Sequence, residues 1–174
     1  FIHQRHIADN SLNRFAGWWG YKKETRFKMD AGFEPIPTAE GWQLSNAPVL
    51  SMAVHKAAVE LVDEAGIANL SVKGKQLSAY LIFILKELSV KFPGDEISVI
   101  TPENEQERGC QVSFIIKKDG KKVFEKLMAQ GVSAGWREPE VIRVAPVPLY
   151  NTFEEIWEFG EMINKILAGS TMNA

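Results

Sequence analysis

Apolar residues recur three and four positions apart over residues 49–62, which is the spacing of one face of an α-helix. Ser45 or Asn46 is expected to cap this helix, with Pro48 in its first turn, where the missing N–H of proline does no harm. Gly66 follows the last apolar pair and is expected to end the helix. The pattern therefore predicts one amphipathic helix between Asn46 and Gly66.

A second helix and four short strands are expected further along the chain. Leucine and isoleucine keep helical spacing over about residues 68–91, and Pro93-Gly94 stops the run. The period of the apolar positions then shortens to about two, which is typical of strands with one buried face. The expected strands are residues 97–100, 111–116, 132–136 and 141–144.

Two more helices lie among and after these strands. Residues 121–130 are expected to form a short amphipathic helix that Gly131 closes. The last helix begins with a capping box, formed by Thr152 and Glu155, and is expected to end at Gly169. Long helices followed by a small, mostly antiparallel sheet covered by helices indicate an α+β fold.

Residues 1–45 have no sustained period and are rich in glycine and aromatic residues, including three of the five tryptophans. A loop segment of this length is uncommon in a compact domain unless it is functional or is held by another part of the protein. Glycine permits close backbone approach, and tryptophan supplies a large ring with one N–H donor. This composition suits the wall of a ligand site, and it equally suits aromatic loops that pack on another domain.

The charge balance argues against two classes of partner. Lysine and arginine total 20 against 22 aspartate and glutamate residues, so nothing electrostatic favours nucleic acid or an anionic membrane. No stretch approaches the ~18 apolar residues of a membrane span.

The single cysteine, Cys110, cannot form an internal disulfide, which favours a reducing compartment such as the cytoplasm. The amino end mixes charged and aromatic residues, which is not the pattern of a secretory signal.

The sequence has few candidate metal ligands and few candidate nucleophiles. His3, His6 and His55 have no further ligands at workable spacing, so no metal site is expected. Cys110 enters an apolar strand, which favours a core position over a nucleophile.

Arg143 is the first candidate for ligand binding. It ends a β-rich run and precedes Pro146 and Pro148, which hold the following backbone extended. A rigidly placed guanidinium suits bidentate recognition of a carboxylate, and a surface salt bridge at the end of a strand is an equal alternative. Trp18 and Asn46 form a second group, because an indole N–H and a side-chain amide can both donate to a phosphate or a hydroxyl.

An ordered set of short motifs resembles the kynureninases, members of the aspartate-aminotransferase-like (fold type I) family of pyridoxal-phosphate enzymes. Each motif is weak alone, but the set follows the family's order over almost the whole chain. The matching stretches are residues 17–20, 25–29, 44–48, 100–102, 107–111, 136–139 and 142–151.

The resemblance implies hydrolysis of the Cβ–Cγ bond of L-kynurenine or 3-hydroxy-L-kynurenine, giving anthranilate or 3-hydroxyanthranilate and L-alanine. This step belongs to tryptophan catabolism and NAD biosynthesis. The implied cofactor is pyridoxal 5'-phosphate, which acts as an electron sink. By the same resemblance, Arg143 binds the substrate α-carboxylate, Trp18 the cofactor phosphate, and Asn46 both the cofactor and the substrate. Trp19 is expected to stack on the substrate ring.

The resemblance also implies what lies elsewhere in the protein. The Schiff-base lysine is expected upstream of Phe1, so no catalytic residue is assigned here and the chain alone should not turn over. Residues 1–66 correspond to the end of the large cofactor domain, with active-site loops and the start of a connecting helix. Residues 67–174 correspond to a small C-terminal α+β domain. A homodimer with active sites at the subunit interface and a small-molecule substrate are implied as well.

The chain departs from the family at one place, and two other functions also fit its sequence. Ala134-Gly135 stands where the family often has Cys-Asp. A different fold type I enzyme, such as a desulfurase-like enzyme or an aminotransferase, is one alternative, against which the ordered motifs argue. A stand-alone α+β interaction module without catalysis is the other, because the lysine is not in this sequence.

Overall fold

The computed structural model describes residues 1–7, 9, 11–28 and 30–171 of the 174-residue chain. Contacts divide the chain into two compact units, Phe1–Ala58 and Val59–Ala174, and the division falls within helix α2 (Val49–Ala65). Met29, the last residue of one motif, lies outside the described residues. Within the described residues, no helix is long and apolar enough to cross a membrane.

The first unit is mainly loop, and backbone hydrogen bonds between its turns hold it together. Its short elements are α1 (Gln4–Ile7) and the 3-10 helices η1 (Trp18–Gly20) and η2 (Ala39–Trp42). The Gly20 N–H donates to the Gln43 carbonyl at 3.0 Å, and the Gly20 carbonyl accepts from the Ile36 N–H at 2.8 Å. A methyl group added at Gly17 would overlap the backbone of Leu44. Glycine is therefore required here by the close approach of loop to loop.

Helix α2 begins later than the sequence predicts. Its first residue is Val49, and the Pro48 carbonyl accepts the Met52 N–H at 2.9 Å. Neither Ser45 nor Asn46 caps the helix, so that prediction was wrong. The physical reason is that the residue before a proline is held out of the helical region, so the helix cannot extend back through Ala47. Gly66 does follow the helix, as expected, with a φ of 79°.

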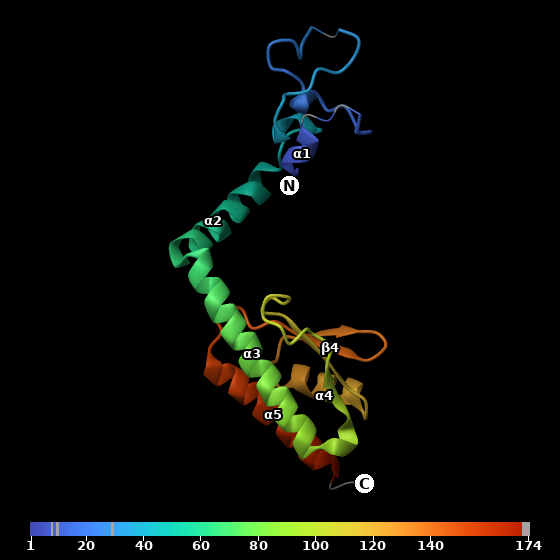
Figure 1. Ribbon diagram of the computed structural model, residues 1–174, viewed down its shortest axis with the longest axis vertical. Coiled ribbons are helices and arrows are strands. Elements are labelled where there is room, and N and C mark those ends of the chain that lie inside the picture. The colour runs from blue at the N-terminus through green and yellow to red at the C-terminus, as the bar shows by residue number, and fades with distance from the viewer. Residues whose placement is uncertain (8, 10, 29, 172–174) are drawn as a thin grey trace. The chain divides into compact units, whose positions relative to one another are not determined.

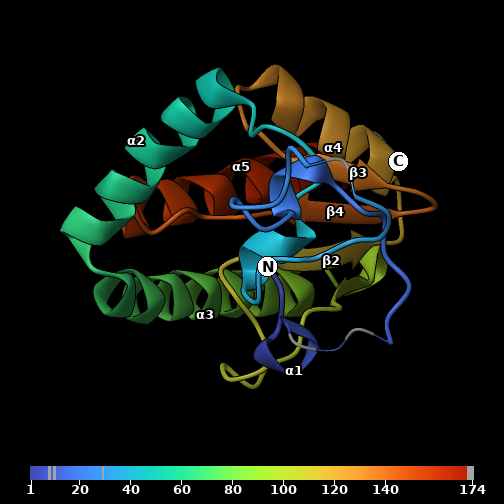
Figure 2. The ribbon, with the colours of Figure 1, turned by 90° about the horizontal axis from the view of Figure 1, so that it is seen from above.

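A four-stranded antiparallel sheet lies in the second unit, in the order β1-β2-β4-β3. Its strands are β1 (Ile97–Val99), β2 (Val112–Ile116), β3 (Gly135–Arg137) and β4 (Val141–Val144). The helices that pack with it are α3 (Ile67–Lys91), α4 (Gly120–Ala129) and α5 (Phe153–Thr171), and the short 3-10 helix η3 (Pro93–Asp95) links α3 to β1. Helices α3 and α5 run side by side (Figures 1 and 2).

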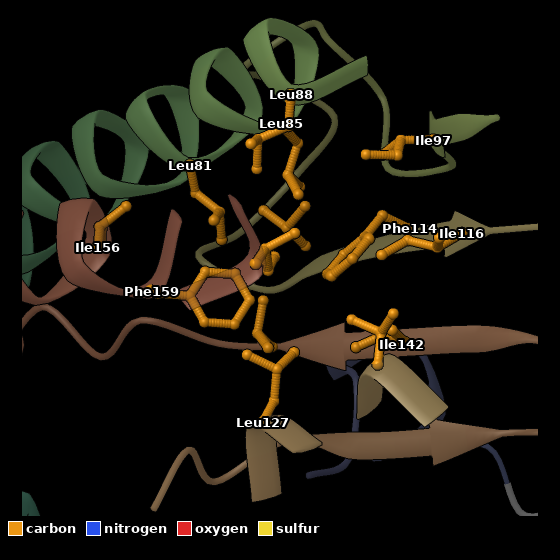
Figure 3. Packing of buried hydrophobic residues seen from close by; sticks show 14 of the residues in the cluster. Leu81, Leu85, Leu88, Ile97, Phe114, Ile116, Leu127, Ile142, Ile156 and Phe159 are labelled. Atoms are coloured by element: carbon orange, nitrogen blue, oxygen red, sulfur yellow. The ribbon is translucent and has the colours of Figure 1, made fainter. Parts of the chain in front are cut away.

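Alternate strand positions and the inner faces of the helices build the core of this unit. In β2, Val112, Phe114 and Ile116 are buried, while the residues between them are half-buried. The Phe114 and Phe159 rings meet edge to face, with centroids 6.4 Å apart, within the buried cluster (Figure 3). Helices α3 and α5 contribute Leu77, Leu81, Leu85, Leu88, Ile156, Ile163 and Leu167. The predicted periods of these helices and strands are confirmed.

The end of α4 explains why the next strand starts late. Gly131, with a φ of 90°, closes the helix as predicted. Its N–H donates to the Met128 carbonyl at 3.1 Å, and the Val132 N–H donates to the Leu127 carbonyl at 3.1 Å. This Schellman closure uses the backbone of Val132 for the helix end. Strand β3 therefore begins at Gly135, and the prediction of a strand from residue 132 was wrong.

Helix α5 starts as the sequence predicts but ends later. Its capping box is formed, because the Glu155 N–H donates to Thr152 Oγ1 at 3.1 Å and the Thr152 N–H donates to Glu155 Oε2 at 2.8 Å. Gly169 does not end the helix, which continues to Thr171. Gly169 has no positive φ, so the backbone stays helical there.

Candidate functional site

Arg143 lies on β4, paired with Ser113 of β2 on one side and Gly135 of β3 on the other. Its neighbours Ile142 and Val144 are buried, so its half-buried side chain leaves the opposite face of the sheet. Its Nε lies 3.6 Å from the position that a Cβ at Gly135 would take. In the described part of the chain, the guanidinium has no hydrogen-bond or ion-pair partner. A partly desolvated cation without a partner favours an anionic ligand.

A cavity of about 720 Å³ lies beside Arg143. Residues 130–135, residues 143–146 and the first turns of α5 line it. The volume is within the range of about 300–1,000 Å³ typical of small-molecule sites. Apolar Leu81 and Met162 and polar Ser133 and Tyr150 share the lining. Glu155 and Glu158 also line the cavity, and Arg143 is the one cation among its described lining residues. The cavity therefore has mixed polar and apolar walls, and Arg143 is the group in it that suits a carboxylate.

A hydrogen-bond network fixes the loop between β4 and α5, which carries one wall of this cavity. Asn151 Oδ1 accepts from the Val147 N–H at 2.8 Å, and its Nδ2 donates to Glu155 Oε2 at 3.1 Å. The Asn151 N–H also donates to the Val147 carbonyl at 2.8 Å. Asn151 thus joins the backbone after Pro146 to the capping box of α5. This role of Asn151 was not predicted from the sequence, although an asparagine directly before a capping box is a signal for it.

The Glu155 carboxylate gives the network a pH dependence. Hydrogen bonds from the Thr152 N–H and the Asn151 amide hold the pKa of Glu155 below its ordinary value of 4.5. Because the folded-state pKa is the lower one, the stabilising contribution is present above pH 4.5 and is lost as the pH falls through the folded-state pKa.

Glu155→Gln is therefore expected to lower the free energy of unfolding at neutral pH, because the amide oxygen can still accept the Thr152 N–H but carries no charge. The difference from the parent should shrink as the pH falls below 4.5. Urea unfolding at a series of pH values measures it. Glu158→Gln is the control, because the Glu158 carboxylate has no hydrogen-bond partner among the residues that the structure describes. A difference that persists at acid pH would contradict the prediction.

The structure brings Trp18 and Trp19 together in the first unit. Their rings meet edge to face with centroids 5.0 Å apart, and Phe27 lies 6.0 Å from Trp18. Both indoles remain partly exposed, at 45% and 37%. The guanidinium of Arg26 contacts both rings, with its Cζ 5.3 Å from Trp18 and 5.0 Å from Trp19. From the sequence, Arg26 was recognised only as part of a motif, and no role was predicted for it.

Two donors in this unit suit a phosphate-bearing cofactor. The indole N–H of Trp18 and the side-chain amide of Asn46 have no hydrogen-bond acceptor among the described residues. Asn46 is exposed in the segment before α2, and because it does not cap the helix its amide is available to a ligand. Phosphate oxygens accept such bonds, so the residues present fit this group.

Metal ligands are not gathered anywhere in the described residues, where no group of three or more His, Cys, Asp or Glu side chains could hold an ion. Arg143 belongs to the second unit, and Trp18, Trp19 and Asn46 belong to the first. Within its unit, each part shows side chains that are available to a ligand.

Comparison with known protein families and curated proteins gives consistent matches. The family described as kynureninase C-terminal domain matches residues 70–163. The chain is 48% identical over 165 residues to a kynureninase of Flavobacterium psychrophilum, covering 95% of this chain and 39% of the relative. It is 46% identical over 169 residues to a kynureninase of Flavobacterium johnsoniae, covering 97% of this chain and 40% of the relative. The chain thus spans about two fifths of the length of these relatives.

Solved structures share the fold at low sequence identity. A C-DES mutant with glycine covalently linked to its pyridoxal-phosphate cofactor matches with a TM-score of 0.63 at 19% identity, over 97% of this chain and 40% of that one. The apo cysteine desulfurase of Thermococcus onnurineus NA1 matches with a TM-score of 0.63 at 12% identity, over 90% of this chain and 39% of that one. The predicted fold class is confirmed: helices and a small antiparallel sheet, as in the corresponding part of fold type I enzymes.

Proposed function

Because the chain belongs to the kynureninase family, we propose that it forms the substrate-recognition part of a pyridoxal-phosphate-dependent hydrolase. The proposed reaction is cleavage of the Cβ–Cγ bond of kynurenine or 3-hydroxykynurenine by water, with release of alanine and an anthranilate. The proposed pathways are tryptophan catabolism and NAD biosynthesis. The motifs on which the resemblance rests run from Gly17 to Asn151, so they lie before and within the residues that the family matches.

The observation that carries the proposal is the unpaired guanidinium of Arg143 beside a cavity of about 720 Å³. An amino-acid substrate has a carboxylate on Cα, and a planar guanidinium binds it through two parallel hydrogen bonds. Such a contact fixes the rotation of the substrate about its Cα and so positions the bond that breaks. Of the two sequence-based alternatives for Arg143, carboxylate recognition is the one we propose, because Arg143 forms no salt bridge in the described structure, although Glu155 and Glu158 line the same cavity.

The residues of the first unit take complementary roles in this proposal. The Trp18 N–H donates to the cofactor phosphate, and Trp19 lies against the substrate ring. Asn46 donates to the cofactor or to a 3-hydroxyl of the substrate. Bound pyridoxal phosphate supplies the electron sink for cleavage. The lysine that carries it belongs to residues outside this chain.

The same proposal extends to the assembly of the whole protein. Residues 1–66 are proposed to end the large cofactor domain, and residues 67–174 to form the small domain. The positive φ of Gly66, between α2 and α3, supports a boundary there, whereas contacts divide the chain earlier, between Ala58 and Val59 of α2. The complete protein is proposed to be a cytoplasmic homodimer that acts on a small molecule. The exposed apolar side chains of α2, among them Leu50 at 83% and Val54 at 74%, are consistent with further contacts in that assembly.

The test is turnover by the complete protein with added pyridoxal phosphate. We expect release of alanine together with anthranilate or 3-hydroxyanthranilate, and no release without the cofactor. Asn46→Thr is expected to lower the ratio of kcat/KM for the hydroxylated substrate to that for kynurenine, because the shorter side chain no longer reaches the hydroxyl. Lys23→Met is the control, since Lys23 is exposed and has no interaction partner among the described residues.

The outcomes separate the alternatives. Lyase activity on cysteine in place of kynurenine would indicate another fold type I enzyme. A complete protein that binds no pyridoxal phosphate would indicate a non-catalytic module. An unchanged ratio of kcat/KM in Asn46→Thr would contradict the role of Asn46 alone.

A further inference from the structure

We propose that Arg26 is a positioning residue that sets the mutual orientation of Trp18 and Trp19, and through them the binding of cofactor and substrate. The effect on ligands rests on the proposed function, whereas the effect on the two indoles does not. Two kinds of contact between Arg26 and the Trp18-Trp19 turn, and one buried donor atom of Arg26, support the proposal.

The first contact is with the backbone that carries the indoles. Arg26 Nη2 donates to the carbonyls of Trp19 and Tyr21, each at 3.0 Å. These two carbonyls lie within and directly after η1, a single turn of 3-10 helix whose last N–H bond, from Tyr21 to Trp18, is 3.4 Å long. A turn this short has little stability of its own. The charged hydrogen bonds of Arg26 therefore hold it closed from outside.

The second contact is with the rings themselves. The Arg26 Cζ lies 5.3 Å from the Trp18 centroid and 5.0 Å from the Trp19 centroid, so one guanidinium contacts both indoles. Cation–π attraction acts at such distances, and tryptophan is its strongest partner. The two rings meet at 76° to each other. Because the Arg26 guanidinium is attracted to the Trp18 ring and to the Trp19 ring at once, it favours this angle between the two partly exposed rings over other angles.

The third observation concerns the Nε of Arg26. This atom is buried and has no hydrogen-bond partner in the described structure. A buried donor without an acceptor is costly, and it persists where other contacts of the same group outweigh the cost. Contacts made through Nη2 and the guanidinium plane thus determine where Arg26 lies. The neighbours Gly17 and Gly20 have no side chains that could take over this task.

A lysine cannot replace this arrangement. Its ammonium is a compact point charge, whereas the guanidinium donates to two carbonyls from one edge while its plane lies against the rings. Arg26→Lys should therefore loosen the indole pair while keeping the charge. Since Trp18 is proposed to contact the cofactor and Trp19 the substrate, Arg26→Lys is expected to weaken both by about tenfold each. Trp18→Phe should weaken the cofactor alone, and Trp19→Leu the substrate alone.

The experiment uses the complete protein and two independent readouts. Circular dichroism reports the exciton couplet that two indoles in edge-to-face contact produce, with the Trp18→Phe spectrum as the reference for its absence. Equilibrium dialysis measures the dissociation constant of pyridoxal phosphate, and KM is measured for the substrate. Arg14→Lys is the matched control: Arg14 lies 4.5 Å from the Trp42 ring in the same unit and contacts neither Trp18 nor Trp19.

The expected result is loss of the couplet, a raised cofactor dissociation constant and a raised KM in Arg26→Lys, with none of these in Arg14→Lys. Arg26→Met should show the same changes more strongly, and cooperative thermal unfolding shows that each variant is folded. If Arg26→Met does not fold, the lysine variant carries the test. An unchanged couplet in Arg26→Lys would overturn the positioning role. A lost couplet with unchanged cofactor and substrate binding would instead overturn the ligand roles given to the tryptophans.

Discussion

Arg143→Ala in the complete protein is expected to raise KM for the substrate by about 30- to 1,000-fold, and to leave the dissociation constant of pyridoxal phosphate nearly unchanged. The range corresponds to about 2–4 kcal/mol, the cost of removing one partner from a partly buried hydrogen-bonded charge pair. Arg143 has no partner in the described structure that could compete for its guanidinium, so a bound carboxylate takes the full contact.

Two variants sharpen this prediction. Arg143→Lys should fall between the parent and Arg143→Ala, because it keeps the charge and loses the bidentate geometry. Arg137→Ala is the matched control, since Arg137 lies on the neighbouring strand β3, is exposed, and among the described residues donates only to the adjacent Trp136 carbonyl. Steady-state kinetics and equilibrium dialysis of the cofactor are the measurements. Loss of the cofactor in Arg143→Ala, with KM unchanged, would show that the arginine contacts the phosphate and not the substrate.

Phe114→Ala is expected to lower the free energy of unfolding by about 3–5 kcal/mol, the usual range for a buried phenylalanine. Phe114 is 0% exposed, and it packs against Phe159 of α5 (Figure 3). Its removal leaves a cavity between β2 and α5 that the surrounding strands can fill only in part. The loss combines the transfer of an aromatic ring from water with the empty space that remains.

Urea unfolding measures this loss, read from the midpoint at constant m-value. Phe83→Ala is the control, because Phe83 lies on α3 with 56% of its surface exposed and stacks on Tyr80 with centroids 6.4 Å apart. We expect that change to cost about 1 kcal/mol or less. Equal losses in the two variants would mean that Phe114 is not in the core that the structure shows.

Periodicity was a sound guide to the second unit because its elements are amphipathic. The leucines of α3 and the alternating residues of β2 are buried, and the spacing of apolar residues along the sequence marks such buried positions. The Thr152 and Glu155 box fixed the start of α5 for a local reason, since both hydrogen bonds join residues three apart. Such features depend on a few neighbouring residues and can be predicted from one sequence.

The errors occurred where backbone geometry, which side-chain spacing does not record, decides the outcome. Because of Pro48, α2 begins at a later residue than predicted, and because of the Schellman closure at Gly131, β3 does too. Gly169 has a helical backbone, so α5 continues past the residue where the sequence suggested its end. The roles of Arg26 and Asn151 were missed for another reason. The Arg26 side chain reaches back to a turn formed earlier in the chain, and Asn151 bonds to residues on both sides of itself. Both arrangements exist only once the loops have folded.

Gly135 lies opposite Arg143 in the sheet and adds backbone but no side chain to the lining of the cavity. A Cβ there would stand at ordinary contact distance from the guanidinium, 3.6 Å from Nε, so the backbone could accept a side chain without rearrangement. A substitution at Gly135 would therefore change the surroundings of the Arg143 guanidinium without replacing the arginine itself. By the resemblance the family often has an acidic residue at this position, and such a side chain would stand beside the guanidinium, while a bulky one would narrow the space around it. With glycine, the space beside the guanidinium stays open, so a substitution at Gly135 would test how much that space matters for the proposed binding of a carboxylate.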